Sequence, residues 1–463
     1  MASLQGLSKI RLIPNKNYKR SGTKSYVYLL NKWGFEPTKP GPYFQMNKAT
    51  ATSASFHKFG HKSQTQRVLA KKTATGENGE VPAEDQQNDS EYLCPVQIGT
   101  PAQTLMLDFD TGSSDLWVWS TELPKATTSN ATGHTIFDPK KSSTFKAAKS
   151  SKWQISYGDS SSASGTVGTD TVSLGGLAIK NQAVELATKL SAQFEQGAGD
   201  GLLGLAWGSI NTVTPTPVAT PVENMISQED IPSDAELFTV NLGSWRDADE
   251  ADKGASFYTF GYIDQDVVGS QEIYYTPVDN SQGFWMFDST SATVNGKTVA
   301  QTGNQAIADT GTTLALVSDE TCQAIYDAIP GSTYDSEQQG YTFPSNTSAD
   351  DLPVVTFAVG GKQFAVQKED LGFADAGNGM VYGGIQSRGS MTFDILGDTF
   401  LKGIYAIFDQ GNTRFGAVQR TEATQNTAAP QLRLFSGMEY GFGTFVYLGG
   451  FVRLWVWLGV FGS

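Results

Sequence analysis

The stretch LDFDTGSS, residues 107–114, reads as an apolar strand that runs into a glycine turn. Residues 306–313, AIADTGTT, repeat this pattern far downstream. Each copy is followed by two apolar residues and a glycine, at 202–204 and at 395–397. A single Asp-Thr-Gly is common and is typical of a turn. Two copies in the same context indicate an internal duplication.

The duplication predicts a pseudo-twofold molecule in which Asp110 and Asp309 meet near the axis. Two carboxylates at hydrogen-bond distance do not both ionise easily, so they share one proton over a wide pH range. One of them then serves as a base that activates water, and the other protonates a carbonyl oxygen. We therefore predict that Asp110 and Asp309 hydrolyse an amide bond without a covalent intermediate.

The residues beside each aspartate predict how the pair is held. A glycine lacks a Cβ, so the backbone approaches the carboxylates closely and donates N–H bonds to them. The threonine hydroxyls are suited to bonding the backbone across the axis, and the next hydroxyls are suited to bonding the outer carboxylate oxygens. These supporting residues are Thr111, Gly112, Ser113, Thr310, Gly311 and Thr312.

Residues 153–174 predict a β-hairpin, with an alternating strand, a turn rich in Gly and Ser, and a second strand. Tyr157, Gly158 and Asp159 lie near its tip. A mobile hairpin that covers a binding site excludes water and holds a peptide. Taken alone, a tyrosine at this position is more often an ordinary strand aromatic.

The composition favours an all-β fold and excludes several kinds of chemistry. Short strand-like runs bounded by turn residues recur along the chain, and the length of 463 residues suggests about two packed units plus extensions. Two cysteines and three histidines leave little scope for a disulfide framework, a zinc site or a Ser–His triad. We expect no metal and no cofactor, so that carboxylates carry any hydrolysis.

Charge is distributed very unevenly along the chain. Residues 1–72 hold 14 of the 33 Lys and Arg residues and one acid, Glu36, which gives +13 there and −27 in the remainder. A basic arm beside an acidic body is suited to binding that body, a nucleic acid or a membrane. The alternative is a solvated tail without a role. No nucleic-acid motif accompanies it, and an acidic body repels phosphate. We expect the arm to bind the body.

On these residues the chain resembles the pepsin family of aspartic endopeptidases, and specifically its fungal branch (aspergillopepsin, penicillopepsin and endothiapepsin). Further support comes from residues 157–159, 200–206 and 395–398. The resemblance implies an all-β, bilobal pepsin-like fold of two pseudo-twofold-related, β-barrel-like lobes with a cleft between them. It also implies an aspartic-type endopeptidase that acts on polypeptides at acid pH.

The resemblance assigns further roles, residue by residue. Tyr157 corresponds to the flap tyrosine and Trp117 to its indole hydrogen-bond partner. Asp159 corresponds to a flap aspartate that contacts substrate backbone and favours Lys beside the cleaved bond.

The substrate-binding positions implied by the resemblance are Asp108, Phe194, Leu202 and Thr313. Asp108, Phe194 and Leu202 correspond to walls of a primary pocket for large apolar side chains. For Phe194 and Leu202, plain core packing is the alternative interpretation.

The expected organisation has five parts: a basic propeptide at 1–72, a polar and irregular linker at 73–90, lobes at 91–255 and 256–419, and an apolar tail at 420–463. The propeptide is expected to inhibit the enzyme intramolecularly and to leave as pH falls, with Lys58 as one of several lysines suited to the dyad. The tail is read as an unstructured extension or an artefact of gene prediction rather than as a membrane anchor.

Two other functions stay open at this stage. The first is an inactive peptide- or glycan-binding protein, or an inhibitor, on the same fold. The second is a membrane-bound processing protease anchored by the tail. For the enzyme itself we expect a monomer that is secreted or vacuolar, although no signal peptide is visible in this chain.

Overall fold

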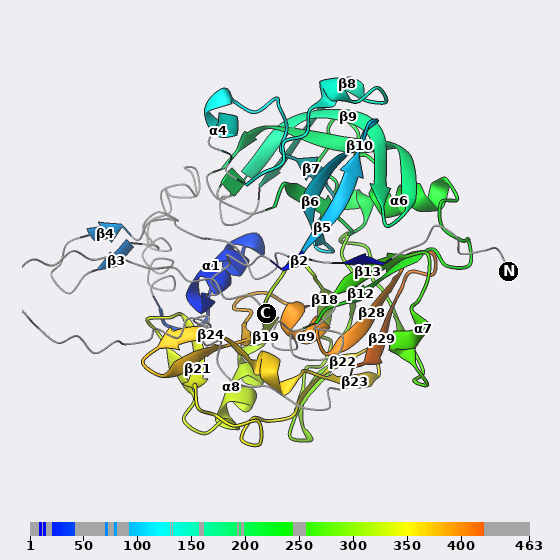
Figure 1. The fold of residues 1–463 in the computed structure, drawn as a ribbon. Helices are drawn as coiled ribbons and strands as arrows, with labels where there is room; N and C mark the ends of the chain where they lie inside the picture. Colours follow the sequence, from blue (N-terminus) through cyan, green and yellow to red (C-terminus); the bar gives the residue numbers. More distant parts are fainter. Residues whose placement is uncertain are drawn as a thin grey trace, which may run out of the picture. The chain divides into compact units, whose positions relative to one another are not determined.

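The computed structural model describes residues 9–11, 13–14, 21–41, 70–72, 78–80, 92–129, 131, 133–156, 162–191, 194–195, 199–243 and 256–420. The chain divides into two units, Met1–Ala429 and Pro430–Ser463, and the described residues all belong to the first. Strands dominate this unit and its helices are short, which confirms the all-β prediction (Figure 1).

The internal repeat of the sequence is present as a repeated strand arrangement. In the first half, β11 lies between β6 and β7, parallel to β6 and antiparallel to β7, and β10 runs parallel to β7. In the second half, β27 lies in the same way between β18 and β19, and β26 runs parallel to β19. The strands are β6 (Gln103–Asp110), β7 (Leu116–Val118), β10 (Leu177–Leu190), β11 (Gly201–Gly204), β18 (Gln305–Ala308), β19 (Ala315–Val317), β26 (Ile385–Ser387) and β27 (Asp394–Leu396).

β11 ends at Gly204, and β27 is followed directly by Gly397. Each glycine lets the backbone of its strand pass close to the Asp-Thr-Gly turn beside it. A Cβ on Gly204 would lie 2.5 Å from the Cα of Ser114, and a Cβ on Gly397 would lie 1.9 Å from the carbonyl oxygen of Thr312. Both contacts are with backbone atoms, which cannot move aside as the end of a side chain can. The apolar-apolar-Gly signature of the sequence therefore has a steric cause.

The remaining strands extend these two sheets and build smaller ones. In the eight-stranded sheet, β8 and β9 form the hairpin expected for residues 153–174, paired as far as Ser156 and Ser162. The additional strands of the first half are β2 (Ile13–Pro14), β5 (Tyr92–Ile98), β8 (Lys146–Ser156) and β9 (Ser162–Leu174). Those of the second half are β15 (Met286–Asp288), β16 (Ser291–Val294), β17 (Lys297–Ala300), β20 (Thr333–Asp335), β21 (Gly340–Pro344), β22 (Val355–Val359), β23 (Lys362–Ala365), β24 (Gly372–Gly377) and β25 (Met380–Gly383).

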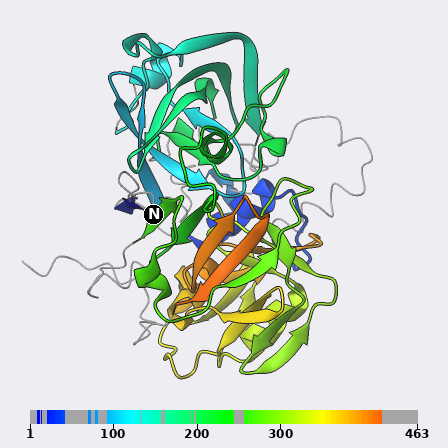
Figure 2. The same cartoon turned by 90° about the vertical axis from the view of Figure 1, so that its right-hand side faces the viewer.

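A six-stranded sheet joins the two halves (Figure 2, green and orange strands). Its order is β1-β13-β12-β28-β29-β14, and β12 pairs antiparallel with β28. Every residue of β12, β13 and β28 is buried, so these strands are mainly apolar and show no alternation of buried and exposed positions. The strands are β1 (Ile10–Arg11), β12 (Leu237–Asn241), β13 (Phe257–Phe260), β14 (Tyr274–Pro277), β28 (Ile404–Asp409) and β29 (Arg414–Gln419). The lobe boundary at 255/256 stays a prediction, because both flanking strands lie in this one sheet.

The helices are short, and some of them begin at side-chain caps. α6 has a complete capping box, in which Thr220 and Glu223 each accept from the other's backbone N–H. α8 begins after Ser318, whose hydroxyl accepts from the N–H of Thr321. The α-helices are α1 (Gly22–Lys32), α4 (Lys125–Ser129), α6 (Pro221–Ser227), α7 (Gln265–Val268), α8 (Asp319–Asp327) and α9 (Asp398–Leu401), and the 3₁₀ helices are Pro139–Lys141, Gly208–Ile210 and Lys368–Leu371.

The basic arm contributes helix α1 to the first unit (dark blue in Figure 1). Its buried residues Tyr26, Leu29 and Leu30 recur at helical spacing, and they pack on β24 and β21 of the second half. The apolar cluster around them also holds Phe35 of the arm and Leu314, Leu316, Phe373, Tyr382 and Ile395 of the body. Full burial of such a side chain contributes about 1.5–3 kcal/mol. Apolar contacts therefore attach the arm to the body in addition to attraction between charges.

Two other extensions differ in how far the structure describes them. The linker was expected to be irregular, but β3 (Ala70–Lys72) pairs with β4 (Asn78–Glu80) at its start, so the Lys71-Lys72 pair lies in a hairpin. Apart from Arg420, the tail lies outside the described residues. Within the described ranges, no helix is long and apolar enough to cross a membrane.

A pair of buried carboxyls lies inside the first half, away from the Asp-Thr-Gly turns. Asp115 is 1% exposed and Glu185, on β10, is 0% exposed, and the Asn211 amide donates to both at 3.2 and 3.1 Å. Burial raises the pKa of Glu185 well above its ordinary value, and the charge of Asp115 and the hydrogen bond between the two carboxyls raise it further. The neutral form of Glu185 therefore stabilises the folded state.

Glu185→Gln should make the fold less sensitive to rising pH. The stability contributed by neutral Glu185 is fully present below the unfolded-state pKa of about 4.3 and is lost as pH rises toward the raised folded pKa. Between pH 5 and 7 the wild-type free energy of unfolding should therefore fall relative to that of the variant by about 1 kcal/mol per pH unit. Denaturant titrations at several pH values measure this, with exposed Glu272→Gln as the matched control. Parallel pH dependence of all three proteins would contradict the assignment.

Candidate active site

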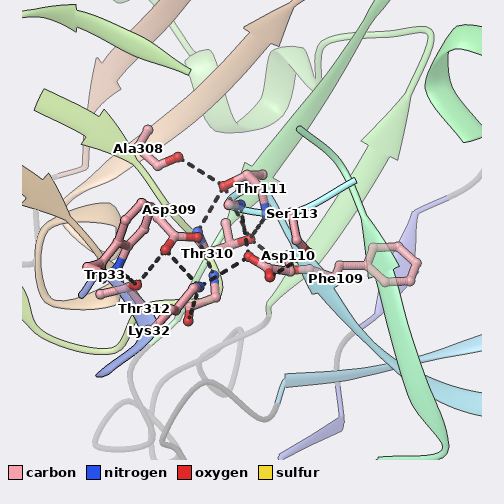
Figure 3. A network of polar contacts seen from close by, with 12 residues as sticks. Lys32, Trp33, Phe109, Asp110, Thr111, Ser113, Ala308, Asp309, Thr310 and Thr312 are labelled. Carbon is pink, nitrogen blue, oxygen red and sulfur yellow. Dashed lines mark hydrogen bonds and ion pairs between the residues drawn. The ribbon is translucent and has the colours of Figure 1, made fainter. Parts of the chain in front are cut away.

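Asp110 and Asp309 lie at the ends of corresponding strands and face each other (Figure 3). Asp110 ends β6 and is 2% exposed, and Asp309 directly follows β18 and is 0% exposed. A Cβ built on Gly112 would lie 2.6 Å from Asp309 Oδ1, and one on Gly311 would lie 2.2 Å from Asp110 Oδ1. Each glycine therefore leaves room for the carboxyl of the opposite half.

Two threonines link the turns by reciprocal hydrogen bonds. The N–H of Thr111 donates to Thr310 Oγ1 at 3.1 Å, and the N–H of Thr310 donates to Thr111 Oγ1 at 2.9 Å. The Thr111 hydroxyl donates to the Ala308 carbonyl at 3.0 Å, and the Thr310 hydroxyl donates to the Phe109 carbonyl at 2.7 Å. All four bonds are buried and cross between the halves, so they fix the separation of the two aspartates.

Each carboxyl receives the same kind of support from its own turn. Gly112 N–H donates to Asp110 Oδ1 at 2.8 Å, and Gly311 N–H donates to Asp309 Oδ1 at 3.0 Å. The Ser113 hydroxyl donates to Asp110 Oδ2 at 2.7 Å, and the Thr312 hydroxyl donates to Asp309 Oδ2. The structure thus brings together the predicted dyad and all six predicted supporting residues.

The surroundings separate the acidities of the two carboxyls. Burial raises the pKa of Asp110, but the Lys32 ammonium, the Ser113 hydroxyl, the Asp309 carboxyl and the Gly112 N–H together hold that pKa below its ordinary value. For Asp309, burial raises the pKa to about 6, with Lys32 opposing and the charge of Asp110 adding to the rise. In this state Asp110 is the charged member, and Asp309 holds a proton below about pH 6.

Lys32, the last residue of α1, brings a cation to the dyad from the basic arm. Its ammonium lies 3.0 Å from Asp309 Oδ2 and 3.5 Å from Asp110 Oδ1, and it donates to the Gly311 carbonyl at 2.8 Å. The side chain is 6% exposed. The next residue, Trp33, donates its indole N–H to Thr312 Oγ1 at 3.3 Å, so two consecutive arm residues contact the site (Figure 3).

Sequence reasoning expected an arm lysine here but suggested Lys58, which lies outside the described residues. The signal that identifies Lys32 is its position at the end of an amphipathic helix. Tyr26, Leu29 and Leu30 recur at helical spacing, and Lys32 and Trp33 come shortly after them. A lysine attached to a docked apolar helix has little freedom to remain in water.

Two of the residues predicted for substrate binding, Asp108 and Leu202, lie on adjacent strands of the first half. Leu202 of β11 is in register with Asp108 of β6 and with Trp117 of β7. Phe194 packs edge-on against Trp117, with ring centroids 4.9 Å apart. Asp108, Phe194 and Leu202 are each half-buried, whereas Trp117 is 1% exposed. Phe194 and Leu202 thus combine core packing with a partly open surface.

Of the other predicted positions, the structure describes Thr313 but not the tip of the β8–β9 hairpin. Thr313 is buried, and its carbonyl accepts from the N–H and the hydroxyl of Thr399 at 3.0 and 3.1 Å. Tyr157, Gly158 and Asp159 lie outside the described residues, so their roles and the Trp117 partnership stay predictions. Among the described residues, no cluster of three or more His, Cys, Asp or Glu side chains is arranged to hold a metal ion.

Comparisons with known proteins agree with this geometry. The family model described as eukaryotic aspartyl protease matches residues 91–420. Aspergillopepsin-1 of Aspergillus oryzae is 42% identical over 77% of this chain and 85% of its own length. Endothiapepsin of Cryphonectria parasitica is 42% identical over 70% of this chain and 74% of its own length. The crystal structure of aspartic proteinase from Irpex lacteus matches with a TM-score of 0.58 at 26% identity, covering 72% of this chain and 96% of that one.

Thr310→Val should destabilise the fold through the reciprocal bonds. The valine leaves the buried Thr111 N–H without its acceptor and the Phe109 carbonyl without its donor, at a cost of about 2–4 kcal/mol. Denaturant unfolding measures this loss. Thr293→Val is the matched control, because its hydroxyl pairs with Thr356 on a half-exposed strand where water replaces it, and its effect should stay within about 0.5 kcal/mol. Equal effects of the two changes would argue against a special role for the buried pair.

Proposed function

The chain belongs to the eukaryotic aspartyl protease family, and from this premise we propose that Asp110 and Asp309 are its catalytic dyad. Membership makes the protein an aspartic-type endopeptidase that hydrolyses peptide bonds in polypeptides. The observation that supports the dyad best is the set of reciprocal Thr111–Thr310 bonds, which hold two buried carboxyls face to face. One chain supplies both carboxyls, which supports a monomer as the active form.

The proposed reaction follows from two carboxyls that share one proton. The charged carboxylate removes a proton from a water molecule, whose oxygen attacks the carbonyl carbon of the peptide bond. The protonated carboxyl donates its proton to the carbonyl oxygen, which gives a neutral tetrahedral diol. Collapse of the diol transfers a proton to the amide nitrogen and releases the amine, and the pair again holds one proton.

We further propose that residues 1–72 hold the enzyme as an inactive precursor. The attacking water must lie within hydrogen-bond reach of both carboxyls, and the Lys32 ammonium occupies that position. Trp33 contacts Thr312 beside it. The apolar side of α1 adds affinity that does not depend on charge, so the ammonium stays in place at neutral pH.

Acid should release the arm because its ion pairs lose their anions. Asp309, with a pKa of about 6, is already largely protonated at mildly acid pH. The low pKa of Asp110 makes it the last of the pair to lose its charge, and the attraction for Lys32 then ends. Lys9 of the arm also pairs with Asp264, and Thr38 donates to Asp319 at 2.6 Å, so the arm has further polar contacts with the body away from the dyad.

The finer features of the function are proposed on more limited support. Partly open Leu202 and Phe194 support a preference for large apolar side chains at the cleaved bond, with Asp159 as the group that accepts Lys. Secretion or delivery to a vacuole remains part of the proposal, and exposed Asn346 in an Asn-Thr-Ser sequence is then a candidate glycosylation site. No described contact favours an inactive binding protein.

Acid incubation of the full chain tests the proposal directly. At about pH 3.5 the wild type should shorten by the mass of an arm that ends near residue 72, and it should then cleave a denatured globular protein. Asp309→Asn keeps the size of the side chain but loses the shared proton, so its rate should fall at least about 10³-fold and its mass should not change on its own. A statine peptide should block the wild type. A processed, folded wild-type protein without peptidase activity would refute the proposal.

Lys32→Met should raise the pH at which the arm is released. The variant keeps an apolar stem against the site but loses the ion pairs with Asp110 and Asp309. Activation, followed by fluorogenic peptide cleavage after stepwise acidification, should begin about one pH unit higher than in the wild type. Processed enzyme provides the control, since both proteins are identical once the arm is gone and must then share the same kcat/KM. Unchanged activation would remove Lys32 from the inhibitory mechanism.

A further inference from the structure

Beyond the dyad, the arm places a second lysine into a prepared site on the second half. Lys39 is half-buried, whereas its neighbours Thr38 and Pro40 are exposed, so its side chain is turned toward the body. The ammonium lies 5.3 Å from the ring centroid of Tyr341 and 5.8 Å from that of Tyr334. Both distances fall within the range in which a ring face attracts a cation.

The two rings are held by the body and do not depend on the arm for their position. Tyr334 of β20 packs edge-on against Tyr341 of β21, with centroids 5.1 Å apart. Tyr341 in turn stacks on Tyr326 of α8 at 4.4 Å. Gln339 donates to the Tyr334 hydroxyl at 3.2 Å and to the Lys39 carbonyl at 3.3 Å. The Gln339 amide thus binds the main chain of the arm next to the two aromatic rings.

Negative charge near the rings also favours a cation. The carboxylate of Asp319, at the start of α8, accepts from the Thr38 hydroxyl at 2.6 Å and from the Ser387 hydroxyl. Asp319 and Asp327 both act electrostatically on Tyr341, and Asp335 acts on Tyr334. This combination of two ring faces with surrounding carboxylates is typical of sites that bind an ammonium or guanidinium group.

We propose that this site, formed by Tyr334, Tyr341 and Asp319 and named here the Lys39 site, binds a Lys or Arg side chain of the polypeptide substrate once the arm has left. The inference rests on the proposed function, in which the arm occupies the substrate path. Lys32 lies at the dyad, and Lys39 follows about seven residues later, a reach of at most about 25 Å in an extended chain. A substrate on the same path therefore places a basic side chain here, remote from the cleaved bond.

The Lys39 site keeps its attraction in acid. Tyrosine phenols are neutral in acid, and burial raises the pKa of both of these still further, so their ring faces keep the same electron density at low pH. The rings therefore attract a cation whether or not the nearby carboxyl groups are charged. Such a site suits an enzyme whose substrates are fully protonated and strongly cationic at its working pH.

Peptides with one cleavable core and a flanking extension test the inference in acid-processed enzyme. Lysine is scanned through positions five to eight residues on either side of the cleaved bond, and each peptide is compared with its norleucine counterpart, which keeps the stem and lacks the charge. At one of these positions lysine or arginine should raise kcat/KM about threefold to tenfold, mainly through a lower KM. The core peptide without an extension reports the basal peptidase activity.

Variants then locate the effect. Tyr334→Leu should reduce the ratio of kcat/KM for the lysine and norleucine peptides to near one, and Tyr334→Phe should preserve it. Tyr275→Leu is the matched control, because Tyr275 is a half-buried tyrosine under the Arg414 guanidinium, 3.8 Å from its ring, and this change should leave the ratio as in the wild type. Equal rates for lysine and norleucine at every position overturn the inference, as does a lysine gain that survives Tyr334→Leu. Failure to cleave even the core peptide would instead count against the proposed function.

Discussion

Two acidic side chains forced together in a dry interior are the constraint on which the rest of this structure depends. Like charges at this distance repel strongly when little water surrounds them, so the fold must both hold Asp110 and Asp309 and relieve their charge. The threonine bonds between Thr111 and Thr310 supply the hold. N–H and hydroxyl donors relieve part of the charge, and in this state the Lys32 ammonium relieves most of the remainder. The two carboxyls are therefore stable in this buried position only while a cation, or a proton shared between them, neutralises part of their negative charge.

The basic arm uses the same features that a substrate would need. It crosses the dyad at Lys32 and Trp33, buries apolar side chains against the second half, and places Lys39 over two tyrosine rings. Charge and apolar contact have different pH responses, since only the first weakens as carboxylates take up protons. An arm held by both can therefore stay bound at neutral pH and still leave in acid. The buried pair of Asp115 and Glu185 favours the same conditions as the proposed activity. Burial raises the pKa of both carboxyls, so the pair is neutral, and stabilises the fold most, at acid pH.

Features that repeat in the sequence could be predicted well from it. The paired Asp-Thr-Gly turns, their glycines and hydroxyls, and the strands that follow them are local patterns, and the structure places all of these residues as the duplication requires. Features that depend on distant pairing could not. The six-stranded sheet joins β12 to β28, so no local signal in 237–241 reveals that the two halves share it. Lys32 was hidden among fourteen basic residues of the arm, because the choice among them depends on where α1 docks. The β3–β4 hairpin was missed for a similar reason, since the polar residues of 73–90 carry no strand pattern.

The sheet shared by the two halves also determines when during synthesis the site can exist. Its central strand β28 spans Ile404–Asp409, and β27, which supports the turn of Asp309, spans Asp394–Leu396. Both elements leave the ribosome after nearly all of the body has been made, although Asp110 and its turn emerge much earlier. A nascent chain thus carries one unpaired aspartate for most of its elongation and has no partner to share a proton with. The order of translation therefore leaves the dyad incomplete until late in synthesis, and the arm, which precedes the body in the sequence, is already made when the second aspartate is added.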